Sequence, residues 1–303
     1  MKQVDGLVVI DKPPGFTSHD VVARCRRIFS QRKVGHAGTL DPDATGILLV
    51  GLGQATRLLQ FLSGLPKRYT GEVVLGTSTS TLDAAGEVTG TWDMRAVTLE
   101  QARAAAAQLT GEIAQVPPMV SAVKVGGRRL HELARAGLEV ERPPRLVHVE
   151  RFDVSWVGAG ETGPVLAIDV ECSSGTYVRS LAADLGSALG GGGHLRELRR
   201  HRVGDFTLQD ALPLDELEAL PAPSSAVRAP AEALRGMSRA AVGPTVAAKV
   251  RYGQVLGLGV LVQAGATGPG PWAVLDADGT LLAVYEAGKP EMVKPAVVLA
   301  PAQ

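Results

Sequence analysis

The pattern of apolar and polar residues predicts an α+β chain whose strands and helices are separated by turns rich in Gly and Pro. Apolar residues recur at helical spacing between Val21 and Phe29, and Thr17 or Ser18 can cap the first turn of that helix. Alternation from Arg68 to Leu75 is typical of a strand. In residues 1–202 the pattern predicts strands at 7–10, 47–50, 68–75, 146–157 and 165–172, and helices at 18–29, 98–109, 128–136 and 177–189.

The segment Gly35 to Gly46 is predicted to be a loop, because it consists mainly of turn formers and polar side chains. Asp41 stands out there, since neighbouring hydroxyl and backbone donors can fix its direction and a fixed carboxylate can act as a nucleophile. An aspartate that only stabilises its own turn fits the same pattern. A further turn, Asp83 to Gly86, predicts a hairpin.

The last quarter of the chain is predicted to form a separate, small β-barrel. A stretch rich in Pro, Ala and Ser, residues 220–230, precedes a Gly-rich tail. Short strands are expected at 260–263, 272–275 and 281–285, with a turn at 276–279. We place the boundary near 242–246, which gives a domain at 1–243 and a second one at 244–303.

Charge and cysteine usage narrow the class of protein. The 303 residues carry 31 basic and 31 acidic side chains, but ten basic and five acidic ones fall in residues 1–70, so positive charge is concentrated early. Cys25 and Cys172 have no CxxC spacing, which argues against a disulfide framework or a structural zinc. The first residues lack a signal-peptide pattern and no apolar run is long enough for a bilayer, so we expect a cytoplasmic protein without membrane association.

Standard nucleotide, metalloprotease and serine-hydrolase motifs are absent. Lys67-Arg68-Tyr69 places two cations beside an aromatic ring at the start of a strand, and Gly175-Thr-Tyr-Val-Arg179 does so at a strand-to-helix turn. The basic run from Arg196 to Arg202 is interpreted as one face of a helix that begins near His194. Each of these three segments, taken alone, is weak evidence of function.

Together these segments resemble the bacterial TruB-type tRNA pseudouridine synthases. The resemblance covers about residues 5–206 and rests on six ordered blocks: Gly6-Leu-Val-Val-Ile-Asp-Lys-Pro-Pro-Gly-Phe-Thr-Ser18, Val34-Gly-His-Ala-Gly-Thr-Leu-Asp-Pro-Asp-Ala-Thr-Gly46, Lys67-Arg-Tyr69, Ser121-Ala-Val-Lys124, Gly175-Thr-Tyr-Val-Arg179 and His194-Leu-Arg-Glu-Leu-Arg-Arg200. It implies a pseudouridine synthase fold with a mixed, mainly antiparallel sheet. The tail resembles the small RNA-binding β-barrel called PUA.

The resemblance implies isomerisation of uridine 55 in the T loop of tRNA to pseudouridine, without a metal or organic cofactor. The N-glycosidic bond must break, the uracil must turn and a C–C bond must form, so the site needs a nucleophile or charge stabiliser and a flipped base. Asp41 matches the family's catalytic aspartate. Three routes stay open for this carboxylate: addition to uracil C6, attack at ribose C1′, and assistance of C2′ deprotonation.

The same resemblance assigns roles to other side chains. Arg179 matches the arginine that pairs with the catalytic aspartate, and Tyr69 matches the aromatic ring that stacks on the target uracil. His36 matches a histidine that fills the space left when bases leave the T loop. The residues expected to contact the substrate are His36, Tyr177, Leu198, Asp83, Lys67 and Arg200. A monomer with tRNA as its partner, and no protein partner, is expected.

Some positions depart from the family pattern. Ser80 stands where other members often have aspartate, Ser174 where a basic residue is common, and Val120 and His131 where tyrosines occur in some members. Weaker or redistributed RNA contacts are expected there. The candidates for phosphate contact are Arg24, Arg26, Arg27, Arg32, Lys33, Arg128, Arg129, Arg199, Arg200 and Arg202.

Two other classes of function are compatible with parts of the sequence. A tRNA-binding or tRNA-folding protein could retain the same loop with chemistry of secondary importance. A glycoside hydrolase using Asp41 would need a second carboxylate about 5 to 10 Å away, and Asp43 shows no sign of such a role. Intact Asp41, Tyr69 and Arg179 favour the synthase.

Overall fold

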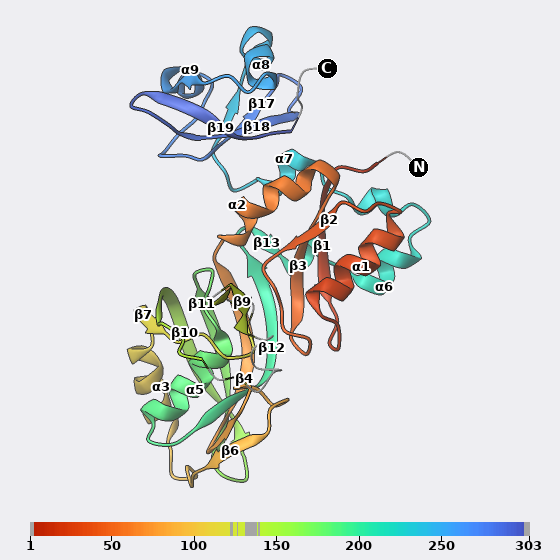
Figure 1. Cartoon of the computed structure of the whole chain (residues 1–303). Helices are drawn as coiled ribbons and strands as arrows, with labels where there is room; N and C mark the ends of the chain where they lie inside the picture. Colours follow the sequence, from red (N-terminus) through yellow and green to blue (C-terminus); the bar gives the residue numbers. More distant parts are fainter. Residues whose placement is uncertain (1–2, 122–123, 126, 131–137, 139, 300–303) are drawn as a thin grey trace. The chain divides into compact units, whose positions relative to one another are not determined.

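The computed structural model describes residues 3–121, 124–125, 127–130, 138 and 140–299, here called the described residues. The chain forms two compact units, each considered by itself (Figure 1). Unit 1 comprises Met1–Pro42, Ile47–Ser63 and Gly204–Gln303, and unit 2 comprises Asp43–Gly46 and Gly64–Val203.

The first part of unit 1 is a small sheet with a helix packed on it. Its elements are β1 (Gly6–Lys12), α1 (Ser18–Ile28), β2 (Val34–Ala37), β3 (Thr45–Leu52), η1 (Gly53–Leu58) and α2 (Leu59–Ser63). β1 lies between β3 and β14 (Leu212–Pro213), and β2 pairs antiparallel with β3. Of β3, Thr45 and Gly46 belong to unit 2.

The predicted helix α1 is confirmed together with its cap. The Asp20 N–H donates to Thr17 Oγ1 and the Asp20 carboxylate accepts from the Thr17 N–H, so both ends of a capping box are present. Val21, Val22 and Cys25 form the buried stripe of α1. They pack in one hydrophobic core with apolar residues of β1, β3 and the later helix α6 (Leu214–Ala219).

The chain returns to unit 1 after Val203 and adds short elements before its C-terminal sheet. These are β13 (Phe206–Thr207), η2 (Leu208–Asp210), β14, α6, η3 (Pro223–Ala226) and α7 (Pro230–Ala233).

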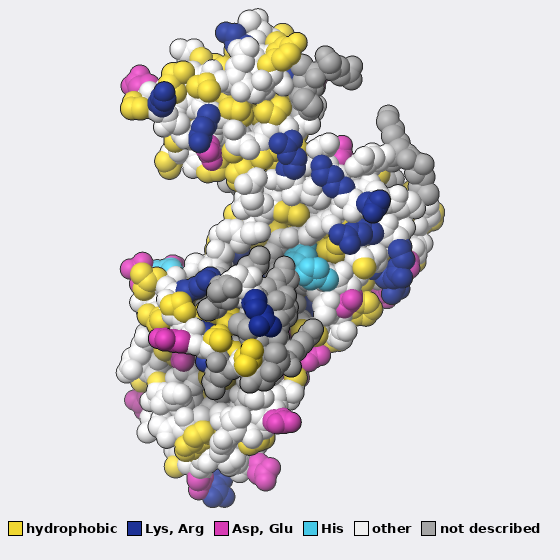
Figure 2. All heavy atoms as spheres, in the orientation of Figure 1, with side chains coloured by type: hydrophobic (Ala, Val, Ile, Leu, Met, Phe, Trp, Pro, Cys, Tyr) yellow, Lys and Arg dark blue, Asp and Glu magenta, His cyan; other side chains and the backbone are white. Residues whose placement is uncertain are grey.

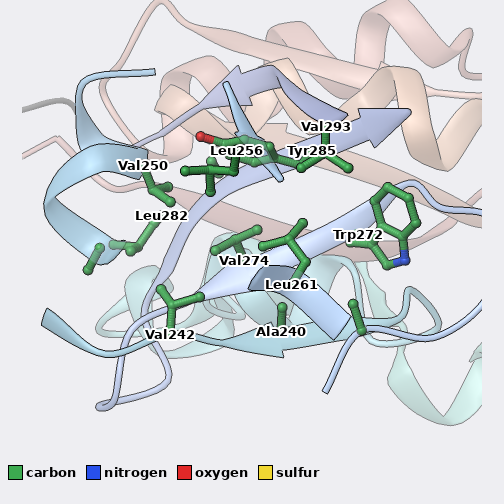
Figure 3. Close-up of a cluster of buried hydrophobic side chains, with 13 residues drawn as sticks. Ala240, Val242, Val250, Leu256, Leu261, Trp272, Val274, Leu282, Tyr285 and Val293 are labelled. Atoms are coloured by element: carbon green, nitrogen blue, oxygen red, sulfur yellow. The ribbon is translucent and has the colours of Figure 1, made fainter. Parts of the chain in front are cut away.

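The C-terminal part of the chain has a core and a curled sheet of its own. Its elements are β15 (Arg239–Ala241), α8 (Pro244–Arg251), β16 (Leu256–Gly257), α9 (Leu258–Gln263), β17 (Trp272–Leu275), β18 (Leu281–Ala287) and β19 (Met292–Val298), and the strand order is β15-β17-β18-β19-β16. Leu261 and Val274 point toward one another in the core, flanked by Trp272 (Figure 3). The expected small C-terminal β-barrel is therefore present as a curled half-barrel sheet.

One predicted strand in this region is wrong. Residues 260–263 lie in α9, where only Leu261 is fully buried and Val262 is exposed. The run of β-branched residues favoured a strand, but one buried side chain per turn is enough to anchor a short helix. The strands predicted at 272–275 and 281–285 and the turn at 276–279 are confirmed.

Unit 2 is built on the larger part of the main sheet. Its elements are β4 (Lys67–Leu75), β5 (Thr77–Thr79), β6 (Val88–Thr91), α3 (Leu99–Gln108), β7 (Gly111–Gln115), β8 (Lys124–Val125), β9 (Arg128–Arg129), β10 (Arg145–Ala159), β11 (Pro164–Cys172), α5 (Val178–Ala188) and β12 (Gly193–Val203). The order is β3-β12-β4-β11-β10-β7, in which β3 and β12 are parallel and the later pairs antiparallel. The predicted α+β class with a mixed, mainly antiparallel sheet is confirmed.

The basic run after His194 is a strand, not the predicted helix. β12 pairs with β4 along its whole length, with register shifts between Leu195 and Glu197 and between Arg200 and Arg202. Each shift adds a residue to the strand and breaks the two-residue alternation of its side chains. Because of these shifts, the apolar positions have a spacing that resembles that of a helix.

The other predicted elements of unit 2 agree with the structure where they are described. β5 and β6 form the expected hairpin, and Thr98 caps α3 through a capping box with Gln101. The helix predicted at 128–136 begins instead with β9, and residues 131–136 lie outside the described residues. Among the residues the structure describes, no helix is long and apolar enough to cross a bilayer.

Candidate active site

Asp41 lies in the connection between β2 and β3 of unit 1, and its two neighbours in sequence are both hydrogen-bonded to the segment that precedes α1. The Leu40 N–H donates to Ser18 Oγ (2.9 Å), and Ser18 Oγ donates to the Leu40 carbonyl (3.2 Å). On the other side, the Pro42 carbonyl accepts from the Gly15 N–H (3.0 Å). The backbone that carries the half-buried Asp41 is therefore held on both sides.

Lys12 adds a second anchor for this loop. Its side chain is fully buried at the end of β1, and Nζ donates to the carbonyls of Pro13 (2.9 Å), Phe16 (2.7 Å) and Pro42 (2.8 Å). A buried ammonium is tolerated when oxygen acceptors surround it. Sequence reasoning gave Lys12 no role of its own, although a lysine at the end of an apolar strand was a signal for such an anchor.

His36 does not lie in the predicted loop. It belongs to β2, opposite Val50 of β3, because pairing with a fully buried strand outweighs the local turn propensity of its neighbours. Its ring meets that of His19 of α1 edge to face, with the centroids 5.2 Å apart and the planes at 86°.

In unit 2, four of the expected residues share one face of neighbouring strands. Lys67 and Tyr69 are two apart on β4, and Arg200 of β12 is directly opposite Tyr69. Leu198 lies two residues before Arg200, opposite Gly71, and its Cδ1 would be 3.4 Å from a Cβ added to that glycine. The structure thus brings together Lys67, Tyr69, Leu198 and Arg200.

This face is unusually polar for its depth. Tyr69 is 7% exposed, Lys67 6% and Arg200 0%. Burial lowers the pKa of Lys67 to about 8, and the nearby Arg200 guanidinium adds to the shift. The Lys67 ammonium donates to the Leu65 carbonyl (2.6 Å). The face therefore combines a buried ring with two cations, and the ammonium of Lys67 loses its proton more readily than that of an ordinary lysine.

Arg179, in the first turn of α5, connects three segments of unit 2. It is 4% exposed and donates from Nη1 to the Thr81 carbonyl (3.0 Å) and from Nη2 to the Val120 carbonyl (2.9 Å). Nη1 also lies 3.3 Å from Asp83 Oδ2, and Asp83 in turn accepts from the Thr81 hydroxyl. The expected substrate contact Asp83 is thus a direct neighbour of Arg179, at the turn of the β5–β6 hairpin.

The backbone that carries Tyr177 is fixed by a buried glutamine that sequence reasoning missed. The Tyr177 N–H donates to Gln115 Oε1 (2.7 Å), and Gln115 Nε2 donates to the Tyr177 carbonyl (3.1 Å). Ser180 donates to the Val116 carbonyl (3.0 Å). A glutamine inside an alternating strand pattern gives no local hint of such a long-range pair.

Asp41 and His36 belong to unit 1, whereas the other expected site residues, Lys67, Tyr69, Asp83, Tyr177, Arg179, Leu198 and Arg200, belong to unit 2. The pairing of Arg179 with Asp41 therefore stays a prediction. Of the positions that depart from the family pattern, Ser80 is exposed and Val120 uses its carbonyl for Arg179, while His131 lies outside the described residues.

Exposed basic side chains gather over the α1 and β2 region of unit 1 (Figure 2). We call Arg26, Arg27, Arg32, Lys33 and Arg57 the basic face of unit 1; all five are exposed, and none forms an ion pair with a described carboxylate. Sequence reasoning missed Arg57. A surface with unneutralised cations can attract an anionic polymer.

Three other predicted phosphate contacts, Arg24, Arg202 and Arg200, are neutralised or buried. Arg24 pairs with Glu218, and Arg202 pairs with Glu171. Arg200 is fully buried on the Tyr69 face. In the part of the chain that the structure describes, no group of three or more His, Cys, Asp or Glu could hold a metal ion.

Comparison with known proteins agrees with this geometry. Residues 26–178 match the family model described as TruB family pseudouridylate synthase (N terminal domain), and residues 179–237 match that of the tRNA pseudouridylate synthase B C-terminal domain. The chain is 47% identical to a protein named tRNA pseudouridine synthase B from Mycobacterium sp. (strain KMS) over 297 residues, 98% of this chain and 97% of that protein.

A second relative of the same name, from Arthrobacter sp. (strain FB24), is also 47% identical, over 98% of this chain and 97% of its own. Among solved structures, a chain in a Cbf5-Nop10-Gar1 complex superposes with a TM-score of 0.76 at 27% identity, covering 98% of this chain and 85% of that one. Fold and matches together define a pseudouridine synthase, an isomerase. The chain belongs to the TruB family of these enzymes.

Proposed function

We propose that this enzyme isomerises uridine 55 in the T loop of tRNA to pseudouridine, after the target base is flipped out of its stack. In the net reaction the bond from uracil N1 to ribose C1′ breaks, and a bond from uracil C5 to C1′ forms. The proton on C5 is lost and N1 gains one. Substrate and product are isomers, so no oxidant or second substrate takes part.

Asp41 is the catalytic carboxylate in this proposal. It acts as a nucleophile if it adds to C6 or attacks C1′, and as a base if it assists deprotonation at C2′. The observation that carries the proposal is the anchoring of its loop, by Ser18 at Leu40 and by Lys12 and Gly15 at Pro42. A carboxylate on a fixed backbone is oriented before substrate binds, so little orientational freedom is lost during the reaction.

Tyr69 is proposed to stack on the flipped uracil. In support, its ring lies on a strand face shared with Leu198, and a flipped base needs a flat, largely apolar partner. Tyr177, Asp83, Lys67 and Arg200 are proposed as further substrate-binding residues. His36 is proposed to fill the space that the displaced bases leave in the T loop.

Arg179 is proposed to hold Asp41 ionised. A guanidinium has five N–H donors in a rigid fork, so it can serve several acceptors at once. In unit 2 it already bonds two carbonyls and faces Asp83, and these contacts fix the direction of its fork.

The basic face of unit 1 is proposed to contact tRNA phosphates. We further propose that residues 1–243 form the catalytic domain and residues 244–303 a PUA-like RNA-binding domain. The separate core of the C-terminal sheet supports this division, although that sheet also includes β15, which precedes residue 244.

Single-site mapping of pseudouridine on an unmodified tRNA transcript tests the proposal. Wild type and Asp41→Ala are incubated with the transcript without added metal or cofactor, and tRNA binding is measured in parallel. Conversion at the T-loop uridine by wild type alone, with similar binding by both proteins, is expected. Wild-type binding without conversion would instead support an RNA-binding or RNA-folding protein, and conversion at another uridine would overturn the proposed position.

A further inference from the structure

The first turn of α1 contributes a histidine that the proposed mechanism does not use. His19 follows Ser18 at the start of the helix and is exposed, whereas His36 on β2 is half-buried. Their planes meet at 86° and their centroids are 5.2 Å apart, which is the edge-to-face geometry, one of the two that aromatic pairs prefer. Since His19 is exposed, this contact lies at the surface and is not part of the hydrophobic core.

Hydrogen bonds tie this ring pair to the loop of Asp41. Ser18, next to His19 in sequence, exchanges two hydrogen bonds with Leu40, next to Asp41. The backbone positions of His19 and Asp41 are therefore fixed by the same contact within unit 1. A group that binds at the two histidines therefore lies at a fixed position relative to the backbone of Asp41.

The surroundings favour a nucleic acid as the ligand. Arg26 and Arg27 are exposed on the same helix as His19, and they belong to the basic face of unit 1. Unstacked bases of RNA bind aromatic side chains, including histidine, by stacking. Two perpendicular rings offer a flat base a face to stack on and an edge to contact.

We propose that His19 and His36 act as one recognition element for an unstacked base of the substrate RNA. His19 is a positioning residue that holds the His36 ring and completes the surface on which the base lies. The proposal rests on the proposed function, since it takes a T-loop RNA as the ligand. It adds His19, and contact with an unstacked base, to a site where His36 alone had been expected to contact the substrate.

The test measures kcat and KM on a T-stem-loop RNA for His19→Ala and His19→Phe. Removing a ring from the surface on which the base stacks weakens RNA binding, so His19→Ala is expected to raise KM about tenfold with kcat nearly unchanged. His19→Phe keeps a ring against His36 and is expected to restore most of the affinity. His148→Ala removes an exposed histidine of β10 that faces only Glu150 among described carboxylates, and it serves as the matched control.

A double-mutant cycle with His36→Ala distinguishes a pair from two independent contacts. If the histidines act together, His19→Ala has little further effect once His36 is removed. Any of three results would overturn the proposal: effects of the two substitutions on KM that multiply, a His19→Phe variant whose KM is as high as that of His19→Ala, or a wild-type KM in His19→Ala. In all three cases the wild-type enzyme still converts the RNA, whereas an inactive wild type would contradict the proposed function itself.

Discussion

Ser18 and Leu40 exchange two hydrogen bonds, although 22 residues separate them in the chain. Both groups are buried, so water does not replace a bond that is lost. The pair fixes the distance between the start of α1 and the residue before Asp41. It links the stability of a small helix–sheet unit to the position of the proposed nucleophile.

Replacement of Ser18 by Ala is expected to lower both stability and kcat. A buried N–H and carbonyl at Leu40 lose their partner, which costs about 1–3 kcal/mol of unfolding free energy. A displaced loop is expected to lower kcat by about 10- to 100-fold, because catalysis is sensitive to shifts of about 1 Å. Urea unfolding and single-turnover rates check this, with exposed Ser225→Ala as control. A destabilised variant with wild-type kcat would show that the loop needs no such anchor.

The Arg179→Lys variant is expected to lose activity by about 100-fold or more, because one ammonium cannot serve the Thr81 and Val120 carbonyls and a carboxylate in the geometry of a fork. Multiple-turnover rates on tRNA provide the measurement. Arg196→Lys is the matched control, since Arg196 is exposed and paired with Glu72. Near-normal rates in Arg179→Lys would mean that charge alone suffices.

Lys67 is expected to make the stability of the protein rise with pH between about 8 and 10.5. Its pKa is lowered by burial to about 8 in the folded protein, from the ordinary lysine value of 10.5 that it regains on unfolding. In this window the unfolded chain binds more protons, so stability rises with pH, by on the order of 3 kcal/mol in full. Urea unfolding from pH 7 to 10.5 should show this rise in wild type and in exposed Lys33→Met, but not in Lys67→Met. Parallel curves for all three proteins would contradict the shifted pKa.

Arg27→Ala is expected to weaken tRNA binding without changing which uridine is modified. One lost phosphate contact should reduce the slope of log K against log salt by about 1. Binding titrations at several salt concentrations measure this slope. Arg95→Ala, which removes an exposed arginine already paired with Asp93, should leave it unchanged. An unaltered slope for Arg27→Ala would remove that residue from the proposed interface.

Sequence patterns predicted elements well where local chemistry and final packing agree. Thr17 and Thr98 begin helices because each satisfies an N–H of the first turn with its own side chain. The prediction was wrong for residues 194–202, where two strand bulges gave a helix-like spacing, and for 260–263, where β-branched residues form a helix. Whether such a segment forms a strand or a helix depends on the neighbouring strand or hydrophobic core against which it packs.

For the site, the blocks of sequence identified Asp41, Tyr69 and Arg179 but not the contacts that hold them. Lys12 and Gln115 are buried side chains whose partners are carbonyls and amides of distant residues. A backbone acceptor carries no signature in the sequence. Their function becomes visible only when the fold brings these groups together.

Gly71 lies beneath Leu198 where β4 and β12 pair, and a Cβ at this position would come within 2.4 Å of the Glu197 carbonyl. Backbone at that distance cannot give way as a side chain can. In a library randomised at the codon for Gly71 and selected for active enzyme, only variants with glycine at this position should be recovered. The codon for Gly64, where no atom lies within 4 Å of an added Cβ, should accept many amino acids. The requirement for glycine at position 71 therefore reports the spacing of β4 and β12 rather than a role in the chemistry.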